Sequence, residues 1–254
     1  MAEQYVPAPA TNAALREKKI PQNSHFCSIL SLLVEIPFLK KIALPKFSFG
    51  LFKSKPTSVV GIDIGAASTK VVQLRYEKER AILETYGELS NASYLKEGEG
   101  GGVGLLRYSD QDIANLLKDA LKESNVTAPA AVFSVPATAS FITQFSLPRL
   151  SLKELEQAVP FEARKYVPIP MAEVVLDWDL LETTENQENR ILLVAVPREV
   201  IEKFKRVSEL SGLTISGLEV ETFSLVRSLV GRDIAPTTLV NMGHLSTSLA
   251  FIDQ

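Results

Sequence analysis

A short polar turn between two apolar runs holds the residues that could bind a phosphate group. The turn runs from Asp63 to Lys70 within the string SVVGIDIGAASTKVVQL. Gly65 can adopt a positive φ that strains most other residues, and the small side chains of Ala66 and Ala67 let a ligand approach the main chain. Successive N–H groups in such a turn can form an anion-binding nest, so the backbone alone could offer a phosphate site.

The side chains of the same turn fit a nucleotide that carries magnesium. Ser68 and Thr69 add hydroxyl donors, and Lys70 adds a positive charge. Asp63 is an anion and would not contact phosphate directly, so its expected role is to hold Mg²⁺, usually through water. The alternative is an ordinary β-hairpin whose Asp and Gly serve the turn, and the turn alone does not decide between the two.

The elements around the turn alternate between strands and helices. Apolar residues over 59–64 and 71–74 predict two antiparallel strands, and 81–89 predict a third. Ser109 is expected to cap a helix whose apolar side chains recur on one face. The run Ala130–Pro136 predicts a strand that is buried on both faces. These elements together predict a mixed α/β fold.

A further group of elements, over residues 138–211, predicts a separate compact module. Strands are expected over 139–147, 174–181 and 191–196. Ser151 and Glu154 form a capping box for the helix after the first of these strands, and Pro160 should kink that helix or end its first part. A second helix from about 199 to 211 should end at Gly212.

Composition excludes several classes of function. The chain has 254 residues, a hydrophobic fraction of 46% and a net charge of −3, which indicates a globular protein without a basic surface for nucleic acid. Cys27 cannot form an internal disulfide, which fits a reducing cytoplasm. With two histidines besides, little remains from which to build a zinc site. The glycine-rich run 97–107 lacks the Gly-Lys-Ser/Thr ending of a P-loop and predicts a surface loop.

Residues 1–56 differ from the rest of the chain. The run Phe26–Leu39 is apolar but shorter than the roughly 20 residues that span a membrane, and Glu35 and Pro37 interrupt it. Lysine and arginine outnumber glutamate here. The segment is either an amphipathic membrane-surface element or a loosely ordered extension, and the lack of a clear polar face favours the extension.

The string from Gly61 to Leu74, G-x-D-I-G-x-x-S-x-K-V-V-Q-L, resembles the first phosphate loop of the actin/Hsp70/sugar-kinase ATPase superfamily. It is most similar to the form found in the PilM family, cytoplasmic actin-like proteins of type IV pilus assembly that are related to the division protein FtsA. Further strings of that family follow in the same order, at 150–168, 176–180, 193–200 and 212–227.

The resemblance implies an α/β, actin-like ATPase (ribonuclease H-like) fold. Residues 57–136 and 212–235 would form the first subdomain, residues 138–211 an inserted FtsA-type subdomain, and residues 236–254 the start of a second lobe. In the string TLVNMGHLSTSLAFIDQ, Asn241, Gly243 and Thr247 occupy the pattern of the second phosphate loop. Asparagine replaces the usual aspartate there, which weakens the expectation of metal binding and hydrolysis. The rest of the second lobe is expected to be missing.

The function that the resemblance implies is that of a scaffold at the inner face of the inner membrane. Such a scaffold would bind the cytoplasmic N-terminal tail of PilN, in a groove between the first subdomain and the inserted module, and would meet other pilus assembly proteins. Contact with the membrane would be indirect or through the basic N-terminal segment. The rival use of the module is self-association, as in FtsA.

The cofactors implied are ATP and Mg²⁺, bound by Asp63 to Lys70 and by the second loop. Glu221 is a candidate for positioning Mg²⁺ or water, against the alternative that it is an acid in the first turn of a helix. Two enzymatic interpretations stay open: an FtsA-like cell-division ATPase and an ATP-dependent small-molecule kinase. Because the nucleotide site is incomplete, the chain is expected not to act as an enzyme by itself.

Overall fold

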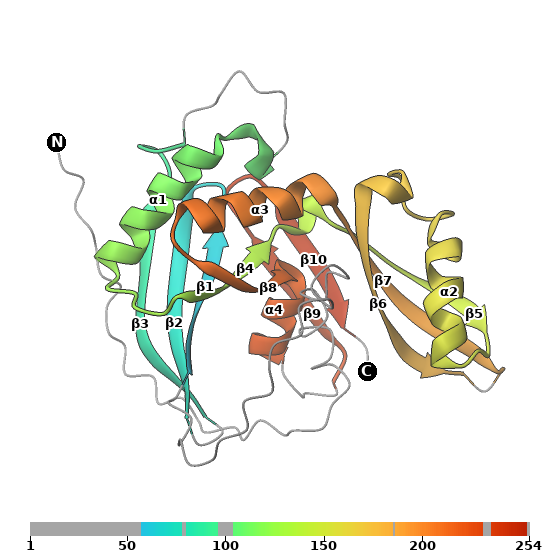
Figure 1. Cartoon of the computed structure of the whole chain (residues 1–254). Coiled ribbons are helices and arrows are strands. Elements are labelled where there is room, and N and C mark those ends of the chain that lie inside the picture. Colours follow the sequence, from blue (N-terminus) through green and yellow to red (C-terminus); the bar gives the residue numbers. More distant parts are fainter. Residues whose placement is uncertain (1–56, 78–79, 96–103, 185, 231–234, 253–254) are drawn as a thin grey trace, which may run out of the picture.

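A five-stranded sheet is the centre of the first subdomain (Figure 1). The computed structural model describes residues 57–77, 80–95, 104–184, 186–230 and 235–252. Its strand order is β3-β2-β1-β4-β8. The first three strands form an antiparallel meander, and β1, β4 and β8 run parallel to one another. The strands are β1 (Thr57–Ile64), β2 (Ser68–Glu77), β3 (Arg80–Ser90), β4 (Ala130–Val135) and β8 (Thr214–Val220).

Two helices, α1 (Asp110–Glu123) and α3 (Arg198–Leu210), lie side by side over one face of this sheet (Figure 1). Side chains alternate between the two faces of a strand, so every second residue of β1 and β4 points into the core beneath the helices. The ring centroids of Phe133 on β4 and Phe204 on α3 lie 5.5 Å apart. The predicted cap at Ser109 is confirmed, because its hydroxyl accepts a hydrogen bond from the N–H of Asp112 at 3.0 Å.

The inserted module is a three-stranded antiparallel sheet, β5-β7-β6, with α2 (Leu152–Ala163) on one face. Its strands are β5 (Phe141–Pro148), β6 (Val174–Thr183) and β7 (Glu188–Pro197). The N–H of Ser151 donates to the Glu154 carboxylate at 2.8 Å, as the predicted capping box requires. Pro160 lies inside α2 without ending it, since the helix continues to Ala163.

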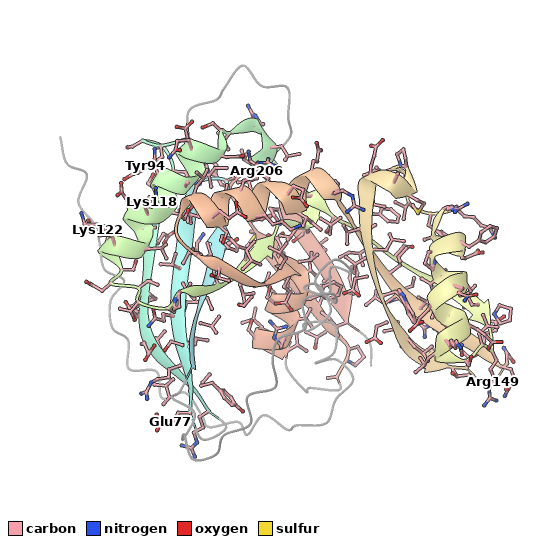
Figure 2. All side chains as sticks on the ribbon, in the orientation of Figure 1. Glu77, Tyr94, Lys118, Lys122, Arg149 and Arg206 are labelled. Carbon is pink, nitrogen blue, oxygen red and sulfur yellow. The ribbon has the colours of Figure 1, made fainter. Side chains whose placement is uncertain are left out.

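The second predicted helix of the module belongs to the first subdomain instead. Helix α3 packs on α1 and β8, and its buried side chains lie in the same core as those of β1, β4 and α1. The Lys203 ammonium is buried and donates to the Tyr108 carbonyl at 2.6 Å and to Asp110 at 2.8 Å. Figure 2 shows Arg206 where α3 passes α1, and this guanidinium also pairs with Asp110. The boundary expected at residue 211 therefore moves to Pro197.

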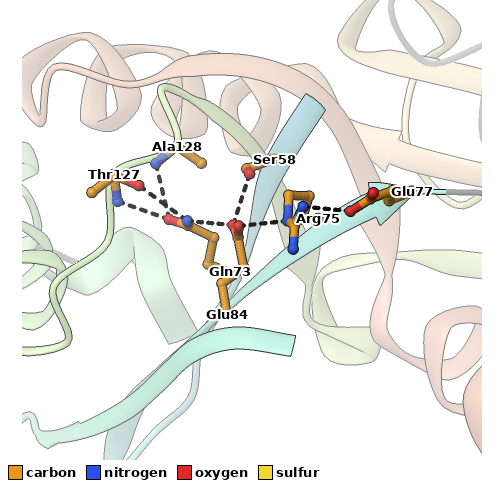
Figure 3. Close-up of polar contacts among 7 residues, drawn as sticks. All are labelled: Ser58, Gln73, Arg75, Glu77, Glu84, Thr127 and Ala128. Atoms are coloured by element: carbon orange, nitrogen blue, oxygen red, sulfur yellow. Dashed lines mark hydrogen bonds and ion pairs between the residues drawn. The ribbon is translucent and has the colours of Figure 1, made fainter. Parts of the chain in front are cut away.

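A buried glutamine ties the strands of the meander to the segment before β4 (Figure 3). The side-chain amide of Gln73 donates to Glu84 at 2.7 Å and to the Thr127 hydroxyl at 3.1 Å. Its carbonyl accepts from the backbone N–H groups of Thr127 and Ala128 at 2.7 and 2.9 Å. Both the nitrogen and the oxygen of the amide are thus hydrogen-bonded, so its burial leaves no polar atom without a partner.

The remaining elements follow β8. Helix α4 (Glu221–Leu225) and a π-helical turn (Val226–Val230) begin directly after the strand, and a hairpin of β9 (Thr237–Met242) and β10 (Thr247–Ile252) ends the described chain. Short 3-10 turns occupy 104–107, 137–139 and 171–173. None of the described helices is both long and apolar enough to cross a bilayer. The predictions for residues 1–56, and most of that for the glycine-rich loop, lie outside the described residues.

Candidate functional site

The first loop is a tight turn between β1 and β2. The N–H of Gly65 donates to the carbonyl of Ser68 at 3.0 Å. A Cβ atom added at Gly65 would lie 2.9 Å from that carbonyl oxygen. Among the described glycines only Gly104 and Gly212 have a positive φ, so the expectation of a positive φ at Gly65 is wrong. Glycine is needed there because the two main-chain segments approach too closely for a side chain.

Asn91, which directly follows β3, forms hydrogen bonds to this turn on its buried side. Its side-chain amide donates to the Gly65 carbonyl at 2.9 Å, and its backbone N–H donates to the Ala67 carbonyl at 2.9 Å. Its side-chain oxygen accepts from the hydroxyl of Thr69 at 3.0 Å. Asn91 and Thr69 are both buried. The hydroxyl of Thr69 therefore stabilises the loop from its buried side. The sequence-based prediction that this hydroxyl is available to donate to a phosphate is not supported by this arrangement. Sequence reasoning missed Asn91, whose only local signal is an amide directly after a strand.

The exposed side of the loop carries mixed charge. Lys70 lies on the opposite face of β2 from Thr69 and donates to the Ser68 hydroxyl at 3.1 Å. Its ammonium lies 3.9 Å from Asp63 and 3.7 Å from Glu88, a β3 residue that sequence reasoning also missed. Burial raises the pKa of Asp63, and the nearby Lys70 charge opposes that rise. Two carboxylates thus surround one ammonium, which is a poor setting for a nucleotide phosphate.

The second loop repeats the turn of the first. The N–H of Gly243 donates to the Ser246 carbonyl at 2.8 Å, and a Cβ at Gly243 would lie 3.1 Å from that oxygen. Asn241 pairs with Ser248 across the β9–β10 hairpin, and Met242 pairs with Thr247. Gly243 and Thr247 are exposed, and Asn241 is half-buried. The two loops therefore share a D/N-x-G-x-x-S-T sequence and one backbone geometry.

Glu221 occupies the first position of α4, as its alternative interpretation expected. Because β1, β4 and β8 are parallel, their C-terminal ends emerge at one edge of the sheet, which is where α/β folds bind ligands. Glu221 follows β8 and Gly65 follows β1 at that edge. Strands in a sheet lie about 4.8 Å apart, so two strand spacings separate them by roughly 10 Å.

A small apolar cavity lies where the first subdomain meets the inserted module. Its volume is about 20 Å³, which is room for roughly one water molecule. The walls come from the ends of β4 and β8, from α4 and α3, and from the face of β6 and β7 that points away from α2. They consist of Val135, Val175, Asp177, Val194, Val196, Ile201, Leu218, Glu219, Val220 and Phe223.

The two strands beside this cavity are edge strands. β8 ends the five-stranded sheet, and β6 ends the three-stranded sheet. An edge strand keeps main-chain donors and acceptors available for an added strand. The groove predicted between the subdomains coincides in place with this small apolar cavity, which is lined by the ends of β4 and β8 and by one face of β6 and β7.

Comparisons with known proteins identify a family and a fold. The family model described as type IV pilus assembly protein PilM matches residues 61–245. A chain of the solved "PilM-PilN type IV pilus biogenesis complex" is 24% identical, with a TM-score of 0.65, and the match covers 76% of this chain and 57% of that one. The predicted α/β, actin-like fold is thereby confirmed. This chain spans less than two thirds of that solved relative.

Two weaker structural similarities were also found. The cytoplasmic domain of EpsL, an inner membrane component of the type II secretion system of Vibrio cholerae, is 10% identical at a TM-score of 0.41, with 65% of this chain and 57% of that one covered. A Ppx/GppA phosphatase of Aquifex aeolicus is 14% identical at a TM-score of 0.35, with 78% and 48% covered.

Proposed function

The chain belongs to the PilM family of type IV pilus assembly proteins, and we propose that it is a peptide-binding scaffold of that assembly. Its ligand is the cytoplasmic N-terminal tail of PilN, and its place is the cytoplasmic side of the inner membrane. The observation that carries the proposal is the junction between β8 and β6, whose apolar walls come from both subdomains.

An extended peptide suits this junction because it can use both kinds of recognition available there. Main-chain hydrogen bonds to an edge strand supply affinity, and alternate side chains enter pockets that supply specificity. The apolar side chains of Val175, Val196 and Phe223 offer such a surface. The cavity of about 20 Å³ is too small for a peptide side chain, so binding requires the module to move slightly away from α4.

Nucleotide binding takes second place in this proposal. The first loop could place Ser68 and Lys70 against a phosphate and Asp63 against a hydrated Mg²⁺, but Glu88 adds a negative charge beside the same ammonium. Thr69 is turned away and buried, and Asn241 lacks the carboxylate expected in the second loop. The residues present therefore fit MgATP poorly, and we derive no hydrolytic step from them.

Titration with the PilN tail tests the proposal. The probe is a synthetic peptide of the cytoplasmic N-terminus of a PilN from the same organism, with calorimetry for affinity and backbone amide shifts for location. We expect saturable binding with shifts along β6, β8 and α4. Trp178, the only tryptophan of the chain, lies on β6 and packs on the α2 side of the module, so its fluorescence reports a rearrangement of the module and not direct contact with the peptide.

A pair of matched variants separates the groove from the rest of the module. Phe223→Ala removes a lining side chain, whereas Phe161→Ala removes a strongly exposed one on α2. The first should weaken peptide binding about tenfold or more, since truncating a buried aromatic anchor commonly removes about 2 kcal/mol, and the second should leave binding unchanged. Self-association of the chain without any peptide-induced shift in either wall would reject the proposal.

A further inference from the structure

The apolar junction contains two carboxylates whose surroundings differ. Glu219 on β8 is buried and receives two hydrogen bonds from the guanidinium of Arg227, in the π-helical turn. Asp177 on β6 lies in the same lining. Glu219 is therefore neutralised by a cation of the same chain, and the two acids differ in whether they have such a partner.

Asp177 has no positive partner in the described part of the chain. Its carboxylate accepts the backbone N–H of Trp178 at 3.0 Å, and no described lysine, arginine or histidine lies within ion-pair distance of it. Asp177 is half-buried. Burial raises the pKa of Asp177, the Trp178 hydrogen bond opposes that rise, and the charge of Asp179 two residues along the strand adds to it. A carboxylate in an apolar wall without a counter-charge is unfavourable, and a ligand cation would relieve this penalty through a charge-assisted hydrogen bond.

We propose that Asp177 determines the specificity of the junction, which selects an extended peptide with a lysine or arginine side chain between apolar ones. The inference rests on the peptide-binding function proposed above and adds the chemistry of the ligand. The expected ligand is a peptide that combines a basic residue with apolar ones. Asp177 supplies a negative charge in the lining, Glu219 is paired with Arg227, and the remaining lining residues are apolar.

The strand geometry also predicts the spacing of the ligand. Val175, Asp177 and Asp179 share one face of β6, because side chains two residues apart on a strand point the same way. A peptide strand added to the free edge of β6 would place its own side chains with the same period of two. A basic residue opposite Asp177 would therefore have an apolar residue opposite Val175, two positions along the peptide.

A double-mutant cycle between protein and peptide tests the assignment. The protein variant is Asp177→Asn, which keeps the shape and the Trp178 hydrogen bond but removes the charge. Its control is Glu156→Gln, which removes one exposed carboxylate of the same module, on α2 and outside the lining. The probes are the PilN tail peptide as encoded and versions in which each arginine is changed to citrulline or each lysine to norleucine, one at a time. Circular dichroism checks that each variant folds.

We expect Asp177→Asn to weaken binding of the encoded peptide about tenfold. It should have no effect on the peptide whose neutralised residue is the one opposite Asp177, and Glu156→Gln should change the binding of neither peptide. Asp177→Lys should in turn prefer a peptide with glutamate at that position. The inference is overturned if the parent binds the encoded peptide but Asp177→Asn binds it equally well, or weakens all peptides alike. It is also overturned if a tail without lysine or arginine binds tightly. Absence of any peptide binding to the parent is a different result, because it removes the proposed function itself.

Discussion

The side-chain amide of Asn91 donates to the carbonyl of Gly65 at 2.9 Å, so the end of β3 holds the turn that follows β1. The same side chain accepts the hydroxyl of Thr69. A turn that resembles a phosphate loop is thus fixed from the buried side by residues that no phosphate would contact.

Replacing Asn91 should loosen the first loop. Asn91→Ala leaves the Thr69 hydroxyl and the Gly65 carbonyl without partners, which commonly removes about 1–3 kcal/mol of stability. Hydrogen exchange of the Ala66 and Ala67 amides should accelerate, and urea denaturation should give the stability change. Adding Thr69→Val to the Asn91→Ala variant should cause little further loss of stability, because both substitutions remove the same hydrogen bond between Thr69 and Asn91. Full additivity of the two changes, or slower exchange in the variant, would contradict this account.

Replacing Gln73 should destabilise the protein more than replacing an exposed glutamine, because its side chain makes several buried hydrogen bonds. Gln73→Ala leaves the N–H groups of Thr127 and Ala128 without acceptors, and we expect a loss of about 2–3 kcal/mol in the free energy of unfolding. Gln111→Ala, on the exposed face of α1, is the control and should change stability by about 0.5 kcal/mol or less. Equal losses in the two variants would mean that the network in Figure 3 contributes nothing specific.

Asp110 should make folding sensitive to acid. Burial raises its pKa, but the hydrogen bonds and charges of Arg206 and Lys203 outweigh that effect and lower it overall. A carboxyl whose folded pKa is lowered stabilises the protein above its unfolded pKa, and this contribution is lost as the pH falls through the folded value. Asp110→Asn should therefore lose less stability than the parent between neutral pH and about pH 3, followed as the melting temperature.

The control for this pH dependence is Glu156→Gln, an exposed carboxyl on α2. It should preserve the acid sensitivity of the parent. At neutral pH, Asp110→Asn should cost about 3 kcal/mol, because the ammonium of Lys203 stays buried without its counter-charge. An unchanged slope of stability against pH in Asp110→Asn would show that this ion pair does not link α1 to α3 energetically.

Glu88 should oppose binding of nucleotide at the first loop. Glu88→Gln removes one of the two carboxylates beside Lys70, and a change of about 1 kcal/mol in local electrostatics corresponds to roughly fivefold in affinity. We expect weak binding of MgATP to the parent in equilibrium dialysis and about fivefold tighter binding to Glu88→Gln. Glu123→Gln, the same change at the far end of α1, should have no effect. Equal affinities of the two variants would exclude Glu88 from the site.

Local signals in the sequence predicted the elements well, because they depend on neighbouring residues only. The caps at Ser109 and Ser151 and the turn at Gly212 were all found where expected. The role of Thr69 was not predicted because it depends on strand register. Thr69 pairs with Ile64, whose side chain faces the core, and nothing within the turn reveals that pairing.

The assignment of α3 failed for a similar reason. An amphipathic pattern shows that a helix buries one face, but it does not identify the partner. Val200, Phe204 and Val207 pack with α1 and the first sheet instead of the module that precedes them in the chain. That Asp177 has no cationic partner among the described residues likewise depends on the fold, which pairs Arg227 of the π-helical turn with Glu219.

β7 ends at Pro197, and α3 begins at Arg198 with no loop between them. A tensile force applied to a peptide held by the module would therefore pass along the backbone of β7 into the crossover helix between β4 and β8. Val194 and Val196 also anchor the end of that strand in the first core. A pull on a peptide held by the module would therefore reach α3 without passing through a loop after β7.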